Sequence, residues 1–328
     1  MTKKSLVALA AAAILTASLF TGCGNRNVGE NGTIMGGVQN VVRKGSTVVL
    51  KPNAGHAEPP ETSVCTNPEV VRAVIREVKK AEPKKIIVAE AAAIGCDTLE
   101  CFKVSGIEAV ANEEGVELRD IKRDKDLVKV AVRDFKSNID YVMLPKFLLE
   151  ADHLINLPIL KAHASMVFSG ALKNIKGVVQ DKVHMQMHQK NLTMAMMDVW
   201  SVCRADINIM DAMHAASGYS PHMPVPIDTD MILGSKDPVA IDRVACEVTG
   251  IDTSSVDYFR VAEETGLGNY SMDMIDVVGD SIEDCYKKMW IPYIGDMSTR
   301  WPEYDVRCQG ACSSCQALLA INMEELKA

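Results

Sequence analysis

The stretch HLINLPILKAHASMVFSGALKNIKGVVQDKVHMQMH, residues 153–188, decides the expected fold. Its first part, residues 153–160, is a short and mostly apolar run of the kind that forms a strand buried on both faces. This expected central strand ends directly before Lys161, and from Lys161 onwards lysine and histidine are frequent. We therefore expect a functional segment to follow the strand at once.

The charge of this segment contrasts with the charge of the whole chain. Between Leu154 and Met197 there are five lysines and a single acid, Asp181, in a chain of formal net charge −8. Three of the seven histidines fall in the same window. A cationic, imidazole-rich segment in an acidic protein is typical of a site for an anionic ligand, a metal or a titrating catalyst. The alternative is a solvated loop with scattered charge.

Apolar runs and amphipathic stretches alternate on both sides of this segment. Strands are expected at residues 46–52, 84–91, 116–121, 127–132, 153–160, 207–213, 231–235 and 274–280. Helices are expected at residues 67–80, 98–114, 191–204, 237–248 and 252–264. This alternation predicts an α/β fold, with a mostly parallel sheet and helices on both of its faces. Ligands of such sheets bind in a crevice at the carboxyl ends of the strands. Residues that end or follow expected strands could converge there: Lys51, Lys161, Asp211 and Ser235.

The N-terminal segment, residues 1–22, is interpreted as a signal peptide. Lys3 and Lys4 precede an apolar run that ends in LFTGC, so the segment resembles a bacterial lipoprotein signal with Cys23 as the lipidated residue. An ordinary cleaved secretory signal is the alternative. Residues 23–45 are rich in glycine and are expected to form a flexible tether, leaving residues 46–328 as the body. The expected location is the cell envelope, outside the cytoplasm, with the membrane contacted through a lipid anchor only.

Composition bounds the possible partners. The acidic net charge argues against nucleic acid, because neutralising phosphates requires a positive surface. After residue 22 no other apolar run is long enough to span a membrane. An anionic small molecule is the expected ligand of the cationic segment.

Six motifs occur in a fixed order along the body. They are KPN (51–53), INLPILKAH (155–163), GALKNIKG (170–177), DKVHMQMHQ (181–189), IMDAMHAASGYSP (209–221) and GSKDPVAIDRVACEVTG (234–250). Together they resemble the domain-of-unknown-function family DUF362 over residues 46–250, with a weaker match towards the C-terminus. Members of this family are often described as iron–sulfur proteins, and some carry a ferredoxin-like cysteine segment.

The resemblance implies a set of site residues. The candidate catalytic residues are Lys161, His163, Lys182 and His184. The candidate ligand-binding residues are Lys51, Asn53, Lys173, Asn174, Gly177, His188, Asp211, Asp237 and Asp242. Lysines suit a carboxylate or phosphate, and a histidine suits proton transfer. Asp237 also has a structural explanation as a helix cap before Pro238, and Asp242 shares a helix face with Cys246, which favours packing.

The spacing of His184 and His188 places both imidazoles on one helix face. A zinc protease uses this spacing with a glutamate after the first histidine, but Met185 stands in that position, so this class is excluded. Clustered methionines beside the histidines would suit Cu(I) in an exported protein. Packing of these methionines into the core is the favoured interpretation.

The cysteines after Cys23 are odd in number and scattered, which is a poor disulfide framework. The exception is the C-x3-C-x2-C segment formed by Cys308, Cys312 and Cys315. Three thiolates at this spacing suit an iron–sulfur cluster with a fourth ligand from elsewhere, and zinc or a redox disulfide are the alternatives. A radical S-adenosylmethionine enzyme is excluded by the position at the chain's end and by Ser314. The leader lacks a twin arginine, so a cluster would have to be assembled outside the cytoplasm.

Two classes of function follow from these observations. The first is an exported, lipid-anchored redox or metal-dependent enzyme, served by a redox partner, that acts on an anionic small molecule in a lysine- and histidine-lined pocket. The second is an envelope lipoprotein that binds an anionic ligand or metal without catalysis. A structural protein that contacts an anionic surface polymer is a third possibility.

Overall fold

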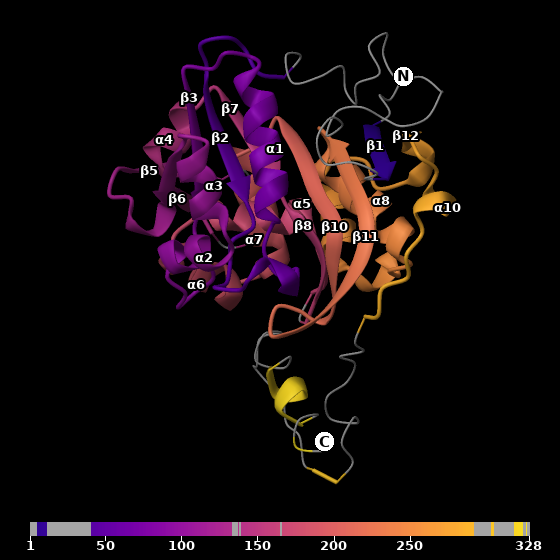
Figure 1. Cartoon of the computed structure of the whole chain (residues 1–328). Coiled ribbons are helices and arrows are strands. Elements are labelled where there is room, and N and C mark those ends of the chain that lie inside the picture. The colour runs from indigo at the N-terminus through magenta and orange to yellow at the C-terminus, as the bar shows by residue number, and fades with distance from the viewer. Residues whose placement is uncertain are drawn as a thin grey trace.

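A ten-stranded mixed sheet forms the centre of the molecule in the computed structural model (Figure 1). The structure describes residues 41–132, 137, 139–164, 166–291, 303–304, 318–323 and 326, and the backbone alone of residues 5–11. Neighbouring strands run in the order β12-β1-β11-β10-β7-β2-β3-β4, and β8 and β9 branch from β10. The strands β5 and β6 form a separate pair.

The strands of the large sheet are β1 (Ser5–Ala11), β2 (Thr47–Pro52), β3 (Lys85–Glu90), β4 (Glu117–Asp120), β7 (His153–Leu157), β8 (Ile159–His163), β9 (Val167–Ser169), β10 (Ile207–Tyr219), β11 (Met223–Ser235) and β12 (Ile275–Gly279). The separate pair consists of β5 (Leu127–Ala131) and β6 (Tyr141–Pro145). The α-helices are α1 (Pro68–Lys79), α2 (Thr98–Val104), α3 (Ile107–Glu113), α4 (Lys146–Glu150), α5 (Ala171–Asn174), α6 (Asp181–Gln189), α7 (Leu192–Val202), α8 (Pro238–Thr249), α9 (Asp257–Thr265) and α10 (Ile282–Cys285). Short 3₁₀ turns are η3 (Pro60–Thr62), η4 (Ile121–Arg123), η5 (Ile175–Val178), η6 (Thr253–Ser255) and η7 (Met272–Met274).

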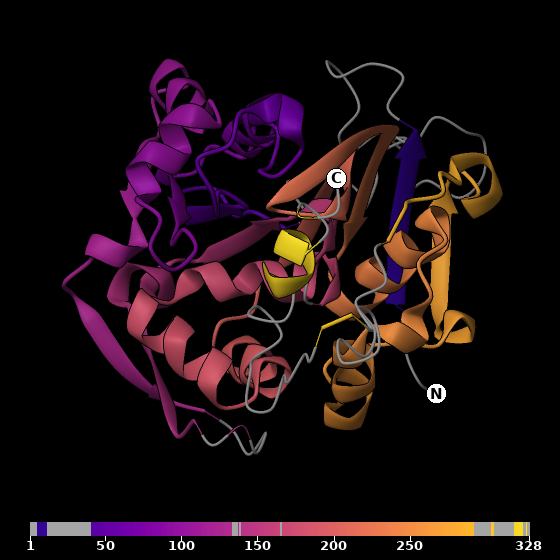
Figure 2. The same ribbon diagram turned by 90° about the horizontal axis from the view of Figure 1, so that it is seen from below.

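The part of the sheet from β4 to β10 is parallel throughout. Antiparallel pairing enters at the long hairpin of β10 and β11 and at the short pair of β8 and β9. The expected α/β class with a mostly parallel sheet is therefore confirmed. Figure 2 shows helices on both faces: α1, α2 and α3 lie on one, and α5 to α7 lie on the other.

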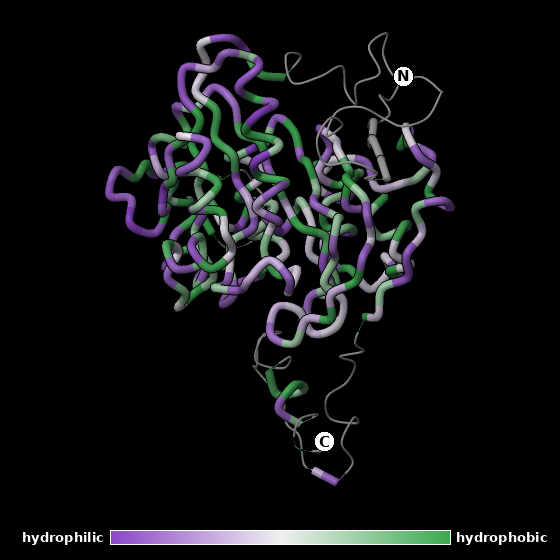
Figure 3. Tube along the Cα trace, in the orientation of Figure 1, coloured by the Kyte–Doolittle hydropathy of each residue, from purple (hydrophilic) through white to green (hydrophobic). Residues whose placement is uncertain are grey.

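Alternate residues of the central strands enter two separate cores, because successive side chains of a strand point to opposite faces. Val48 and Leu50 pack with the apolar face of α1, and Val49 packs on the opposite side with α5, α7 and α8. Figure 3 shows this burial as apolar strands inside and hydrophilic loops outside. A strand covered on both faces needs the continuous apolar run by which it was predicted.

The start of α1 also follows the sequence prediction. The side chain of Asn67 accepts a hydrogen bond from the backbone N–H of Glu69, and Pro68 occupies the first turn. Both residues favour a helix start, since the cap satisfies a free N–H and proline has none to satisfy.

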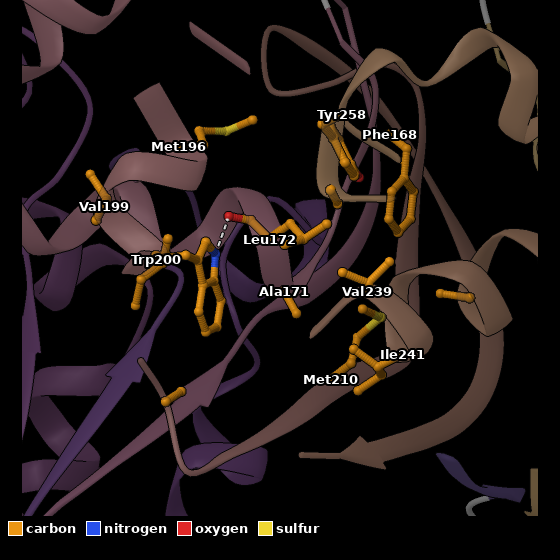
Figure 4. Packing of buried hydrophobic residues seen from close by; sticks show 14 of the residues in the cluster. Phe168, Ala171, Leu172, Met196, Val199, Trp200, Met210, Val239, Ile241 and Tyr258 are labelled. Carbon is orange, nitrogen blue, oxygen red and sulfur yellow. Dashed lines mark hydrogen bonds between the residues drawn. The ribbon is translucent and has the colours of Figure 1, made fainter. Parts of the chain in front are cut away.

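The core that contains Val49 holds the short helix α5 in place (Figure 4). The indole of Trp200 on α7 donates a hydrogen bond of 2.9 Å to the carbonyl of Leu172. Leu172 and Trp200 are almost completely buried, together with Phe168 and Tyr258. This packing fixes the backbone next to Lys173 and Asn174, which are two of the candidate site residues.

Three details of the expected strands and helices are wrong. The strand expected at residues 153–160 is two strands, β7 and β8, separated at Pro158, which has no N–H to donate to a sheet. Lys161 consequently lies within β8 and does not follow a strand. The helix expected at residues 98–114 is divided into α2 and α3 at Gly106, whose φ is 78°.

The third detail concerns the hairpin. Ser235 ends β11, but β11 runs antiparallel to β10 and its Ser235 pairs with Asn208 near the start of β10. Ser235 therefore lies at the edge of the sheet opposite to the carboxyl ends of the parallel strands. Asp211 lies within β10 and does not end a strand.

The strand β1 lies between β11 and β12, antiparallel to the first and parallel to the second. It belongs to the segment that the sequence predicts to be removed as a signal peptide. Removal would leave β11 and β12 without the strand between them. No helix in the described parts of the chain is long and apolar enough to cross a membrane.

Candidate functional site

A pocket of about 520 Å³ opens where β2, β3 and β8 end. Its walls come from the ends of these strands, the loops that follow β2 and β3, the segment from α5 to the start of α7, and the turn of the β10–β11 hairpin. A crevice at the carboxyl ends of the parallel strands is the position that the fold class predicted.

The lining of the pocket is strongly cationic. It includes four lysines and five of the seven histidines of the chain: Lys51, Lys161, Lys173, Lys176, His56, His163, His184, His188 and His222. Glu90 is the one acid among the described residues that line it.

Lys51 and Glu90 form a buried ion pair at the floor of the pocket. The Lys51 ammonium lies 2.8 Å from Glu90 Oε2, and it also donates to the carbonyl of Pro52 and to Asn174 Oδ1. The Glu90 carboxylate accepts two further hydrogen bonds from the backbone N–H groups of Ala54 and Ala91. Glu90, the single acid among the lining residues that the structure describes, is thus engaged within the protein.

Lys161 is held by neutral acceptors. Its ammonium donates to Asn53 Oδ1 at 2.9 Å and to the carbonyl of Val64 at 2.7 Å. Asn53 in turn donates to Asn174 Oδ1, which joins Lys161 to the hydrogen bonds around Lys51. Burial lowers the pKa of Lys161 to about 8. Without a carboxylate partner, this lysine is protonated only in part near pH 8.

Lys173 and Lys176 project from α5 and η5. The Lys176 ammonium lies 2.9 Å from His188 Nε2, and burial lowers the pKa of Lys176 to about 8. Within the described part of the chain, Lys173 makes no hydrogen bond or ion pair of its own. Burial, and then the charges of Lys176, Lys161 and Lys51, lower the pKa of Lys173 well below its usual value. An anion placed beside these ammonium groups would relieve their repulsion.

Burial lowers the pKa of four histidines of the pocket: His56, His163, His184 and His188. Burial and then the nearby lysines lower the pKa of His188 to about 4 and that of His184 to about 3. The same causes lower the pKa of His56 to about 3 and that of His163 well below 6.5. Neutral imidazoles can accept a proton from a bound ligand.

His184 has one ring nitrogen already engaged. Its Nε2 lies 2.5 Å from the carbonyl of Lys176, which requires the proton to be on Nε2, and this leaves Nδ1 as an acceptor.

Gly177 is required by the close approach of the backbone to the buried ion pair. A Cβ at this position would overlap Glu90 Oε1 and lie 2.7 Å from Lys51 Nζ.

We expect Gly177→Ala to lower the free energy of unfolding by about 1–3 kcal/mol, the usual cost of overpacking a core. Urea denaturation checks this value. Gly55→Ala is the matched control, since Gly55 also lines the pocket but its Cβ would meet nothing within 4 Å. An equal loss in both variants would contradict the prediction.

Nine of the candidate residues line the pocket. They are Lys51, Asn53, Lys161, His163, Lys173, Asn174, Gly177, His184 and His188. They come from the end of β2 and the loop after it, from β8, and from α5, η5 and α6, which the fold brings together.

Four candidates lie outside the pocket lining. Lys182 is exposed on α6. Each aspartate accepts hydrogen bonds from backbone N–H groups: Asp211 from Asn67 and Met213, Asp237 from Val239, Ala240 and Asn269, and Asp242 from Ala171 and Leu172. Their positions have a structural explanation, because a carboxylate satisfies the free N–H groups at a turn or helix start. Asp242 supports the site indirectly, since it holds the first turn of α5.

The structure also adds residues that the sequence did not single out for the site. They are His56, Glu90, Lys176 and His222, together with a group of apolar side chains. The sequence did contain a signal for Glu90, because an acid at the end of a buried apolar strand needs a partner. His56 and His222 lie in loops that only the folded chain brings together, with ring centroids 6.1 Å apart.

Metal binding in the described part of the chain has no support from geometry. No group of three or more histidine, cysteine, aspartate or glutamate side chains there is placed to hold an ion. Met187, Met196 and Met197 are buried in the core and Met194 packs against it, as the packing interpretation expected, but that interpretation is wrong for Met185, which is 49% exposed. Cys23, Cys308, Cys312 and Cys315 lie outside the described residues.

The described C-terminal helical segment, residues 318–323, lies beside the pocket. Ala320, Ile321 and Met323 pack against Ala164 and Tyr219. Ala164 lines the pocket, and Tyr219 directly precedes the hairpin turn that contributes to it. Figures 1 and 2 show this helical segment, in yellow, beside the tip of the β10–β11 hairpin.

Fold and site together define an α/β protein with a cation-lined pocket at the carboxyl ends of its parallel strands. The chain belongs to the DUF362 family, described as a domain of unknown function, whose model matches residues 48–247. The matched region contains every residue of the pocket.

Two known proteins are similar to this chain. The thylakoid-associated protein sll1697 of Synechocystis is 26% identical over 242 residues, which cover 71% of this chain and 72% of that protein. The structure of the lactate racemase apoprotein from Thermoanaerobacterium thermosaccharolyticum superposes with a TM-score of 0.44 at 16% identity. That alignment covers 76% of this chain, and it spans only 58%, less than two thirds, of the racemase chain.

Proposed function

We propose that the pocket binds an anionic small molecule and that one of its histidines transfers a proton to or from the bound ligand. One observation carries the proposal: among the described residues of the lining, three lysines have no acidic partner, because the single acid there, Glu90, is bound by Lys51. Cations held in this way lose their repulsion when a carboxylate or phosphate binds. The same arrangement supports an enzyme and, as the alternative, a binding protein.

Each group has a distinct role in this proposal. Lys173, which has no partner within the described residues, contacts the anion directly, and Lys176 and Lys161 add positive potential around it. His188 lies against Lys176, so a proton that it accepts changes the charge beside the ligand. His163 and His184 are the other candidates for proton transfer.

Replacing Lys173 by glutamine is expected to weaken anion binding at least tenfold. Loss of one charged hydrogen bond costs about 1.5–3 kcal/mol, which corresponds to this factor or more. Isothermal titration calorimetry with butyrate, benzoate and inorganic phosphate measures the affinity. Lys190→Gln is the matched control: Lys190 belongs to the same segment but is exposed and outside the lining. Equal weakening in both variants would show that only the overall charge matters.

Replacing His163 by glutamine separates an enzyme from a binding protein. For an enzyme, we expect conversion of a bound ligand, followed by nuclear magnetic resonance, to slow by about 10²–10⁴-fold while affinity stays within about threefold. His214→Gln is the control, since His214 pairs with Asp228 on the exposed part of the hairpin. A ligand that binds tightly and is never converted, even by the unchanged protein, would establish the binding function.

The remaining proposals rest on the sequence. An exported, lipid-anchored protein requires mature chains that begin at a lipidated Cys23, and mass spectrometry of the N-terminus tests this. A redox function with a partner protein requires the C-terminal cysteines to hold an iron–sulfur cluster or a redox disulfide, whereas zinc there would serve a metal-dependent function without redox chemistry. Iron, sulfide, zinc and free-thiol analysis of anaerobically purified protein distinguishes these three.

A further inference from the structure

We infer that the ligand of the pocket is an amphipathic anion, with one carboxylate or phosphate head at the lysines and an apolar tail towards the mouth. The inference rests on the proposed function, since it assumes that the lysines bind an anion. It adds the shape of the ligand and the direction in which it enters.

The charge of the lining changes with depth. At the floor, Lys51 and Lys161 are 1% and 4% exposed, and Lys173, which contacts the anion, is only partly exposed. At the mouth, Ile94 and Met185 are 44% and 49% exposed, although both are large apolar side chains. A ligand that matches this gradient places its charge at the bottom and its apolar part at the opening.

The apolar surface comes from four separate segments. They contribute Ala91, Ala93 and Ile94 after β3, Ala164 after β8, Met185 and Leu192 from α6 and α7, and Pro221 from the hairpin turn. Single exposed apolar residues are ordinary, but their convergence on one pocket is typical of a binding surface for an apolar group. The exposed polar side chains of the lining, Gln189 and His222, include no carboxylate, lysine or arginine.

The number of free cations limits the ligand to one head group. Lys51 is paired with Glu90, Lys161 is bound to Asn53 and Val64, and Lys176 lies against His188. Lys173 alone among these four lysines has no hydrogen bond or ion pair within the described residues. A polyphosphate would require several such cations, whereas a single carboxylate or phosphate requires one.

Titration calorimetry of the full chain with butyrate, octanoate, octyl phosphate and octan-1-ol tests this inference. Burial of one methylene group improves affinity about fourfold. We therefore expect octanoate to bind at least tenfold more tightly than butyrate, and octanol at least tenfold more weakly than octanoate. The comparison of octanoate with octyl phosphate shows which head the lysines prefer.

A double variant, Ile94→Ser with Met185→Ser, is expected to weaken octanoate about tenfold and to leave butyrate unchanged. The control is Leu149→Ser with Met223→Ser, because these side chains are 40% and 42% exposed but lie outside the pocket. Equal affinities for butyrate and octanoate would overturn the amphipathic ligand and leave the anion pocket standing. Octanol that binds as tightly as octanoate, or no binding by any of the anions, would overturn the proposed function itself.

Discussion

Replacing Lys51 by methionine is expected to lower the free energy of unfolding by about 3–5 kcal/mol. The substitution leaves the Glu90 carboxylate, which is 2% exposed, without the cation that lies 2.8 Å away. An unpaired buried charge costs about this much, because the desolvation penalty of the remaining ion is no longer offset. Urea denaturation, followed by circular dichroism, measures the loss.

Glu90→Gln in the Lys51→Met background is expected to recover most of this loss. Glutamine is neutral, and its carbonyl oxygen can still accept from the backbone N–H of Ala54 or Ala91. Lys85→Met is the control on the neighbouring strand, where Lys85 pairs with Glu117 in contact with water. Such surface pairs contribute about 0–1 kcal/mol. A loss below about 1 kcal/mol for Lys51→Met, or no recovery in the double variant, would contradict a charged pair.

The central strands were predictable because burial on both faces leaves a direct pattern in the sequence. The runs that became β2 and β3 are apolar at successive positions, since both cores draw residues from them. The break at Pro158 was also visible in principle, but a single proline does not say whether a strand ends or bends there. The length of the β10–β11 hairpin could not be predicted from the sequence, because both strands extend beyond their apolar residues.

The candidate site was predictable where its residues follow from strand order. Lys51 ends a parallel strand and Lys161 lies in the strand that continues from β7, so both reach the same edge of the sheet. The aspartates show where this reasoning fails. A carboxylate has the same appearance in a sequence whether it accepts from N–H groups at a helix start, as Asp237 does for its own helix and Asp242 for α5, or faces a ligand. Only the positions of the partners distinguish the two roles.

The affinity of the pocket for a carboxylate is expected to fall steeply as the pH rises above 8. Burial lowers the pKa values of Lys161 and Lys176 to about 8, so both are charged at lower pH and neutral at higher pH. A bound carboxylate opposes this shift and raises both pKa values, so binding above pH 8 requires proton uptake. Each lysine that takes up a proton then reduces the affinity by up to about tenfold per pH unit.

Two histidines that lie near these lysines do not compete in this range. The pKa values of His184 and His188 lie at about 3 and about 4, so these imidazoles stay neutral from pH 7 upwards. The carboxylate ligand is fully ionised there, with a pKa of about 4–5. Calorimetry with butyrate between pH 7 and 9.5, in buffers of different ionisation enthalpy, measures both affinity and proton uptake.

The Lys176→Arg variant tests which lysine takes up the proton when the anion binds. Arginine keeps its charge throughout the range, so the variant is expected to lose the share of the pH dependence that belongs to Lys176 while it still binds the anion. Lys161 then accounts for the part that remains, together with Lys173, whose pKa burial also lowers. An affinity that is constant between pH 7 and 9.5, without proton uptake, would mean that these lysines keep their charge in the empty pocket. In that case burial of the lysines would not control binding, and the anion would gain its affinity from fixed charge alone.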